Sequence, residues 1–202
     1  GPRWPGPSAW PWAWGARPNR ARLLAGRRSC TYAAYADDPA GFVRDVLGES
    51  VTPEDVLEGR AQAANAPWQR QQEIMEAVRD HRRVVVRASH SVGKTHIAAR
   101  VGIWFLYTRA PAIVITTAPN YSQVRDLLWA RWRSAWAQAA RPLSGQCLLT
   151  RCDPAVGDSE WYAVGQTARD AESFSGYHEA HLLLIFDEAP GVPAFVWAAA
   201  EG

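Results

Sequence analysis

The chain has 202 residues, of which 48% are hydrophobic, and this composition favours one domain with a buried core plus a tail. Its net charge of +2 does not by itself indicate a nucleic-acid binder. No run of about 18 apolar residues predicts a membrane span, and the N-terminus lacks the apolar segment of a secretion signal. The three cysteines, Cys30, Cys147 and Cys152, have no zinc or redox spacing, which favours a reduced cytosolic protein.

The first 66 residues divide into two parts. Residues 1–36 are rich in tryptophan, proline and arginine without helical or strand periodicity, so we expect a disordered tail. A basic aromatic arm for nucleic acid and a tail with no native role both fit this composition. Residues 37–66 predict a helical lead-in, because Asp38-Pro39 can begin a helix and Gly48 can end it.

A helix expected over residues 68–80 begins with a candidate base-recognition group. The Gln69 amide could make two hydrogen bonds to an adenine edge, and Trp68 could stack or pack beside it. The alternative is an ordinary polar helix face, since two further glutamines, Gln71 and Gln72, follow.

The most informative motif is the loop Ala88-Ser89-His90-Ser91-Val92-Gly93-Lys94-Thr95, a near match to the phosphate-binding pattern G-x-x-x-x-G-K-[ST]. Lys94 is the only lysine among 22 basic residues, so a compact ammonium group occurs at this one place. Residues 83–88 predict a buried parallel strand, and residues 95–108 predict a helix, which together give the context that the motif requires. One departure is Ala88 at a position where glycine usually permits a tight turn. A chance strand–turn–helix remains the alternative.

This loop predicts a nucleotide site with ATP and Mg²⁺ as cofactors. Backbone N–H groups of residues 88–95 would surround the phosphates at the N-terminus of the helix. Lys94 would contact the β- and γ-phosphates, and the Thr95 hydroxyl would bind Mg²⁺.

The middle of the chain predicts a second strand and a long helix. Residues 112–118 are apolar and β-branched, and residues 122–140 have helical periodicity. Arg125, Trp129 and Arg133 are spaced to form one column, which could follow a DNA backbone or be an ordinary solvated face.

Two further strands are expected before the last motif. They cover residues 147–150 and 161–166, and a turn-rich link over residues 152–159 joins them.

Residues 181–186 form an apolar run that predicts a strand ending in two acids, Asp187 and Glu188, the Walker B pattern. Two carboxylates at the end of a buried strand are costly unless they bind a cation or water. Asp187 would hold Mg²⁺ together with Thr95, and Glu188 would orient and deprotonate the attacking water. The alternative is a strand end whose acid caps the next helix. With the phosphate loop, this motif predicts an α/β P-loop NTPase of the RecA/ASCE type, with a mostly parallel central sheet flanked by helices.

Several phrases around these motifs resemble the N-terminal part of the terminase large subunits of tailed bacteriophages. They are residues 38–48, 67–69, 86–95, 117–125, 174–178 and 185–193. The resemblance, over residues 37–202, implies an ATPase motor that drives double-stranded viral DNA into a procapsid. It also implies a homo-oligomeric ring, the portal protein and the terminase small subunit as partners, and the cytoplasm of an infected bacterial host.

The resemblance further implies that residues 67–202 are an ATPase core truncated at its C-terminal side. The coupling strand and the RNase H-like nuclease domain of the family lie further downstream, so we expect an N-terminal fragment without a nuclease. Arg87 is nearest to the place of the family's catalytic arginine but precedes it. The alternatives are a helicase-like DNA-dependent ATPase and a non-catalytic truncated remnant that binds nucleotide.

Overall fold

The computed structural model describes residues 30–49, 69–89, 92–167, 177 and 179–201. Most of the predicted tail, and the part of the lead-in after Glu49, lie outside these ranges. In chain order the elements are η1 (Ala33–Tyr35), α2 (Pro39–Asp45), α4 (Gln69–Asp80), α5 (Lys94–Thr108), β1 (Ile113–Thr117), η3 (Gln123–Leu128), α6 (Trp129–Gln138), β2 (Gln146–Cys147), β3 (Arg151–Asp153), β4 (Tyr162–Gly165), β5 (Leu182–Phe186), η4 (Ala189–Gly191) and α8 (Ala194–Glu201). Within these ranges, every helix is too short or too polar to span a lipid bilayer.

The α/β prediction is confirmed, but the sheet is mixed. Its five strands lie in the order β2-β3-β4-β1-β5. Strand β1 pairs in parallel with β4 and β5, whereas β3 is antiparallel to both β2 and β4. The reversal comes from a hairpin that Leu148 N–H closes on Arg151 O at 2.6 Å. The turn-rich link expected from residue 152 onward therefore contains most of β3.

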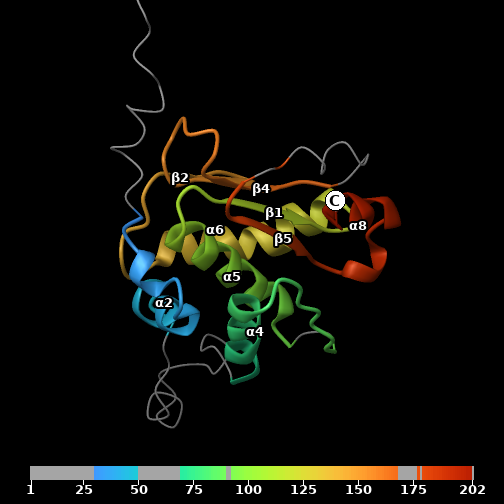
Figure 1. Ribbon diagram of the computed structural model, residues 1–202, viewed down its shortest axis with the longest axis horizontal. Coiled ribbons are helices and arrows are strands. Elements are labelled where there is room, and N and C mark those ends of the chain that lie inside the picture. Colours follow the sequence, from blue (N-terminus) through green and yellow to red (C-terminus); the bar gives the residue numbers. More distant parts are fainter. Residues whose placement is uncertain (1–29, 50–68, 90–91, 168–176, 178, 202) are drawn as a thin grey trace, which may run out of the picture.

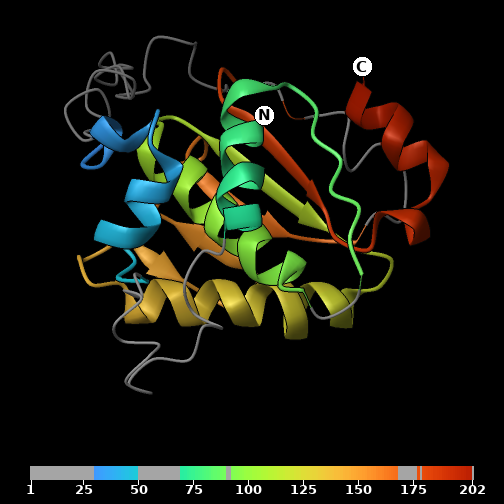
Figure 2. The same cartoon turned by 90° about the horizontal axis from the view of Figure 1, so that it is seen from below.

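Helices α5 and α6 cover one face of the sheet, as Figures 1 and 2 show from two directions. Their shared core holds three fully buried tryptophans, Trp104, Trp129 and Trp132. Gly102 lets the two helices approach closely, because a Cβ at this position would lie 2.2 Å from the Trp132 ring. On the opposite face, Val192 and Val196 pack against Ile113 and Ile115 of β1.

The helix after β1 begins with one π-helical segment, η3, which shifts the register of the expected arginine–tryptophan column. Trp129 is fully buried and donates its indole N–H to Thr116 Oγ1 at 2.8 Å. Arg125 pairs with Asp126 at 2.7 Å, and Arg133 donates to the carbonyl of Arg125. The three residues therefore do not form a continuous surface stripe.

The prediction of a strand over residues 83–88 is wrong. These residues are extended but pair with no strand in the described structure, and Figure 1 shows them beside α4 and outside the sheet. Val85 is 92% exposed. β-Branched residues favour a strand only where a neighbouring strand supplies hydrogen bonds and packing, and no described strand does so here.

Candidate active site

The downstream half of the phosphate loop is fixed by helix α5. Gly93 caps the helix in the left-handed conformation with φ 86°, which glycine adopts without steric cost. Ile97 N–H then donates to Gly93 O at 3.0 Å, and the Ile97 side chain is buried. The first helical residues, Lys94 and Thr95, are thereby held at the helix N-terminus, where the backbone dipole favours anions.

Lys94 turns back across the loop that precedes it. Its Nζ donates to Ser89 O at 2.8 Å and to Ala88 O at 3.2 Å. These contacts use two of the three ammonium protons, so the third can donate to a phosphate oxygen, and a second phosphate contact would have to replace one carbonyl.

Thr95 and Asp187 meet across 92 residues of sequence. Thr95 Oγ1 donates to Asp187 Oδ2 at 3.0 Å. Asp187 directly follows β5, and its N–H donates to Thr117 O at 2.9 Å, which continues the parallel ladder beyond the strand. The side chain is 8% exposed, and burial raises the pKa of Asp187 despite the hydrogen bond from Thr95. A cation at this position would relieve the cost of the buried carboxylate.

Glu188 adopts a backbone conformation that is rare for a residue with a side chain. It has φ 50° and ψ 48°, and it is the only described residue other than glycine with a positive φ. Its N–H donates to Asp187 Oδ1 at 3.2 Å, and its side chain is exposed. Such local strain is frequent at functional sites.

A cavity of about 550 Å³ lies between α4 and the loop. The α4 residues that line it share one face: Arg70, Gln71, Glu73, Ile74 and Ala77. Segment 84–89, which includes Arg87, supplies the opposite wall, and Val92, Gly93, Lys94 and Ile97 close the end.

Gln71 lies over the loop. A Cβ built on Gly93 would come 2.5 Å from Gln71 Nε2. Gln69 is the first residue of α4, but its side chain, like Trp68, His90 and Ser91, lies outside the described residues. The signal was present in the sequence, because Gln71 is three residues before the apolar Ile74 and shares its helix face.

The lead-in is tied to α5 by a buried ion pair. Arg100 Nε donates to Glu49 Oε2 at 2.9 Å, and the two side chains are 7% and 14% exposed. His96 Nε2 lies 3.6 Å from the same carboxylate. Burial alone raises the pKa of Glu49, but hydrogen bonds from His96 and Arg100 outweigh it and hold that pKa below its usual range.

The oxygen atoms at Thr95 and Asp187 suit a hard divalent cation. Mg²⁺ prefers hydroxyl, carboxylate, phosphate and water oxygens, and it commonly takes only one or two ligands from the protein. One hydroxyl and one carboxylate, already in contact beside Lys94, fit that pattern. The described residues contain no cluster of three or more His, Cys, Asp or Glu side chains that would form a metal site of another kind.

Comparison with known proteins identifies one relative. The chain is 30% identical over 145 residues to the probable terminase large subunit of Enterobacteria phage P7. The chain belongs to the terminase large-subunit family. The alignment covers 68% of this terminase chain and 28% of the phage P7 protein, so the chain spans little more than a quarter of that relative. No protein-family model and no solved structure matches it.

Proposed function

We propose that this terminase chain binds Mg·ATP at the N-terminus of α5 and hydrolyses it. The observation that carries the proposal is the 3.0 Å contact between Thr95 Oγ1 and Asp187 Oδ2. This contact joins two motifs that are 92 residues apart in the sequence. Thr95 directly follows Lys94, the only lysine of the chain. A chance strand–turn–helix has no reason to place a hydroxyl, a carboxylate and an ammonium group together.

Each of these groups has a distinct task in the proposed reaction. Lys94 binds phosphate oxygens through its remaining ammonium proton or by exchanging a carbonyl partner, and its charge stabilises negative charge that develops during transfer. Thr95 and Asp187 hold Mg²⁺, which, when bound, supplies further positive charge at the phosphates. Glu188 orients water toward the γ-phosphate and accepts its proton.

The cavity beside α4 supports a position for the nucleobase. Gln71 has an amide that can both donate to and accept from a base edge, and Ile74 offers an apolar surface beside it. We therefore propose base contact by Gln71, while Gln69, whose side chain lies outside the described residues, stays the candidate that the sequence predicts.

Two substitutions separate binding from hydrolysis. Lys94→Ala should abolish nucleotide binding, whereas Glu188→Gln should keep binding and lose turnover, because the amide cannot accept the proton from water. The matched control is Lys94→Arg, whose broader guanidinium should also bind nucleotide poorly. Fluorescent-nucleotide titration and phosphate release measure the two effects. A Glu188→Gln variant that turns over at the parent rate would rule out the role of Glu188.

In the cell, the proposed role is ATP-driven packaging of double-stranded viral DNA, by analogy with the terminase large subunit of phage P7. The proposal includes a homo-oligomeric ring on the portal protein, the terminase small subunit as a partner, and the cytoplasm of an infected bacterium as the location. Stimulation of phosphate release by double-stranded DNA would support this role, and indifference to DNA at all concentrations would contradict it.

Nucleotide binding without turnover is the second candidate. It is favoured by segment 83–88, which lies outside the sheet and leaves Val85 exposed. A loop supported on one side only can bind phosphate yet fail to align it for attack, since catalysis requires tight positioning. In that case the parent chain and Glu188→Gln bind nucleotide equally, and neither releases phosphate.

A further inference from the structure

Two cysteines lie directly opposite each other at the sheet edge far from Asp187. Cys147 of β2 pairs with Cys152 of β3 in the antiparallel register, and β2 is the strand most distant from β5. The next pair toward the turn is joined by the Leu148–Arg151 hydrogen bond, so the cysteines occupy a non-hydrogen-bonded pair. In such pairs the Cα atoms are about 4.5 Å apart, within the range of about 4.4–6.8 Å found for disulfides.

The sulfur of Cys152 lies beside a hydroxyl and an indole N–H. Cys152 is fully buried, and the Tyr107 hydroxyl lies 3.6 Å from its sulfur. The Trp132 indole N–H has no oxygen or nitrogen partner in the described structure. A hydrogen bond from Cys147 lowers the pKa of Cys152, and contacts with Tyr107 and Trp132 lower it further. The same Cys147–Cys152 contact raises the pKa of Cys147.

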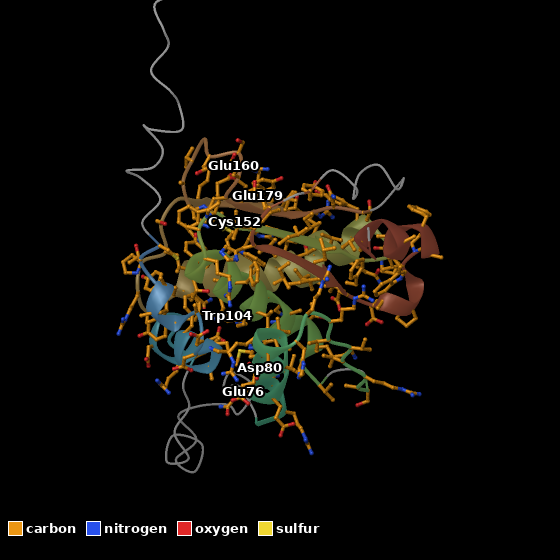
Figure 3. The ribbon with its side chains drawn as sticks, viewed as in Figure 1. Glu76, Asp80, Trp104, Cys152, Glu160 and Glu179 are labelled. Atoms are coloured by element: carbon orange, nitrogen blue, oxygen red, sulfur yellow. The ribbon has the colours of Figure 1, made fainter. Side chains whose placement is uncertain are left out.

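The third cysteine is an internal control for this arrangement. Cys30 donates its thiol to Tyr107 O at 3.0 Å, and burial raises its pKa. It lies outside the sheet, where no strand register places a second cysteine opposite it. Figure 3 shows Cys152 in the sheet layer, on the side of the molecule away from α8.

We propose that Cys147 and Cys152 form a redox-active dithiol, a modification site that small-molecule disulfides such as oxidised glutathione convert to an intramolecular disulfide. The number and spacing of the cysteines in the sequence do not reveal this pair. The two residues become neighbours through the hairpin register and do not belong to a short sequence motif.

The reaction is two thiol–disulfide exchanges. The half-buried Cys147 passes its proton to the Cys152 thiolate, with which it shares a hydrogen bond, and attacks one sulfur of the reagent to form a mixed disulfide. The released reagent thiolate takes that proton from Cys152 and leaves as a thiol. The Cys152 thiolate then attacks the Cys147 sulfur and releases the second reagent thiol. In sum, two protein S–H bonds are lost and one S–S bond forms. The reagent disulfide is reduced to two thiols, which carry the two protons.

The sequence makes the test direct. Trypsin cleaves after Arg133, Arg151 and Arg169 but not between Arg141 and Pro142, so Cys147 and Cys152 fall in peptides 134–151 and 152–169. The folded chain is equilibrated with graded ratios of oxidised and reduced glutathione, and free thiols are then alkylated. We expect loss of two of the three alkylated thiols, a cross-linked pair of these peptides in mass spectrometry, and full reversal by dithiothreitol.

Three variants sharpen the result. Cys30→Ser should oxidise like the parent, whereas Cys147→Ser should lose the cross-link and leave the buried Cys152 unmodified. Cys152→Ser should hold glutathione on Cys147 as a mixed disulfide, and Cys152→Ala repeats this test if the serine variant does not fold. If both peptides of the parent stay alkylated in excess oxidised glutathione, or if the cross-link involves peptide 29–44, the proposal is overturned.

Discussion

The segments on the two sides of the phosphate loop differ in how the rest of the protein holds them. On the downstream side the loop runs into helix α5, in which Ile97 and Trp104 are 3% and 0% exposed. On the upstream side, residues 83–89 lead into the loop from α4 without joining the sheet, and Val85 is 92% exposed. The backbone of Lys94 and Thr95 is therefore held by α5, and Thr95 also by Asp187 after β5, whereas the Lys94 ammonium rests on the carbonyls of Ala88 and Ser89.

We expect the largest loss in the free energy of unfolding from a substitution that breaks the packing of α5. Trp104 is fully buried, and its indole N–H donates to Tyr35 O at 2.8 Å. Trp104→Ala should lower the free energy of unfolding by about 4 kcal/mol, because it leaves a cavity. Trp104→Phe retains most of the volume and should lose only about 1 kcal/mol for the missing hydrogen bond. Denaturant unfolding measures both, and equal losses would show that the hydrogen bond, rather than packing, holds α5.

The buried ion pair between the lead-in and α5 should give the next largest effect. Glu49→Ala leaves the Arg100 guanidinium, 7% exposed, without its carboxylate and should lower the free energy of unfolding by about 3 kcal/mol. Asp126→Ala, which breaks the exposed pair with Arg125, is the matched control and should leave the unfolding midpoint unchanged.

The contribution of Glu49 should depend on pH. Its pKa in the folded chain lies below the ordinary value of 4.5, so its stabilisation is fully present above that value and is lost as the pH falls below it. The stability difference between the parent and Glu49→Gln should therefore be constant near neutral pH and shrink below about pH 4.5. A difference that grows on acidification would contradict this assignment.

A smaller effect of opposite sign is expected at Glu188. Glu188→Gly should raise the free energy of unfolding by about 1 kcal/mol, because glycine adopts positive φ without steric strain. The same variant should lose phosphate release. Glu188→Gln keeps the strained backbone, so it should lose turnover without gaining stability. Thermal unfolding and phosphate release of the two variants, measured together, separate strain from chemistry.

The smallest change in the free energy of unfolding should come from segment 83–88, which precedes the loop. Val85→Ser removes an exposed side chain and should change the free energy of unfolding by no more than about 0.5 kcal/mol. A loss of several kcal/mol would mean that segment 83–88 packs in solution as the buried strand that its sequence predicts.

The sequence predicts those features that depend on local pattern. The Asp38 cap and apolar face of α2, the period of α5 and the two acids after β5 are all local signals, and each predicts its element. Motif order also predicts the meeting of Thr95 and Asp187, and the contact forms although the segment that leads into the loop lies outside the sheet.

The remaining features depend on partners that a local pattern does not reveal. The valines of segment 83–88 look like a strand, but strand formation requires a neighbour. The pairing of Cys147 with Cys152 depends on where the hairpin turns. The position of Gln71 over Gly93 depends on how α4 packs against the loop.

The most direct test of the nucleotide–magnesium site is calorimetric titration with a non-hydrolysable ATP analogue, with and without Mg²⁺, for the parent and Asp187→Asn. We predict that Mg²⁺ strengthens binding to the parent, and that Asp187→Asn loses this enhancement but keeps the magnesium-free affinity. Parent binding that is indifferent to Mg²⁺, or an Asp187→Asn variant with the full enhancement, would contradict the assignment of Thr95 and Asp187 as one metal site.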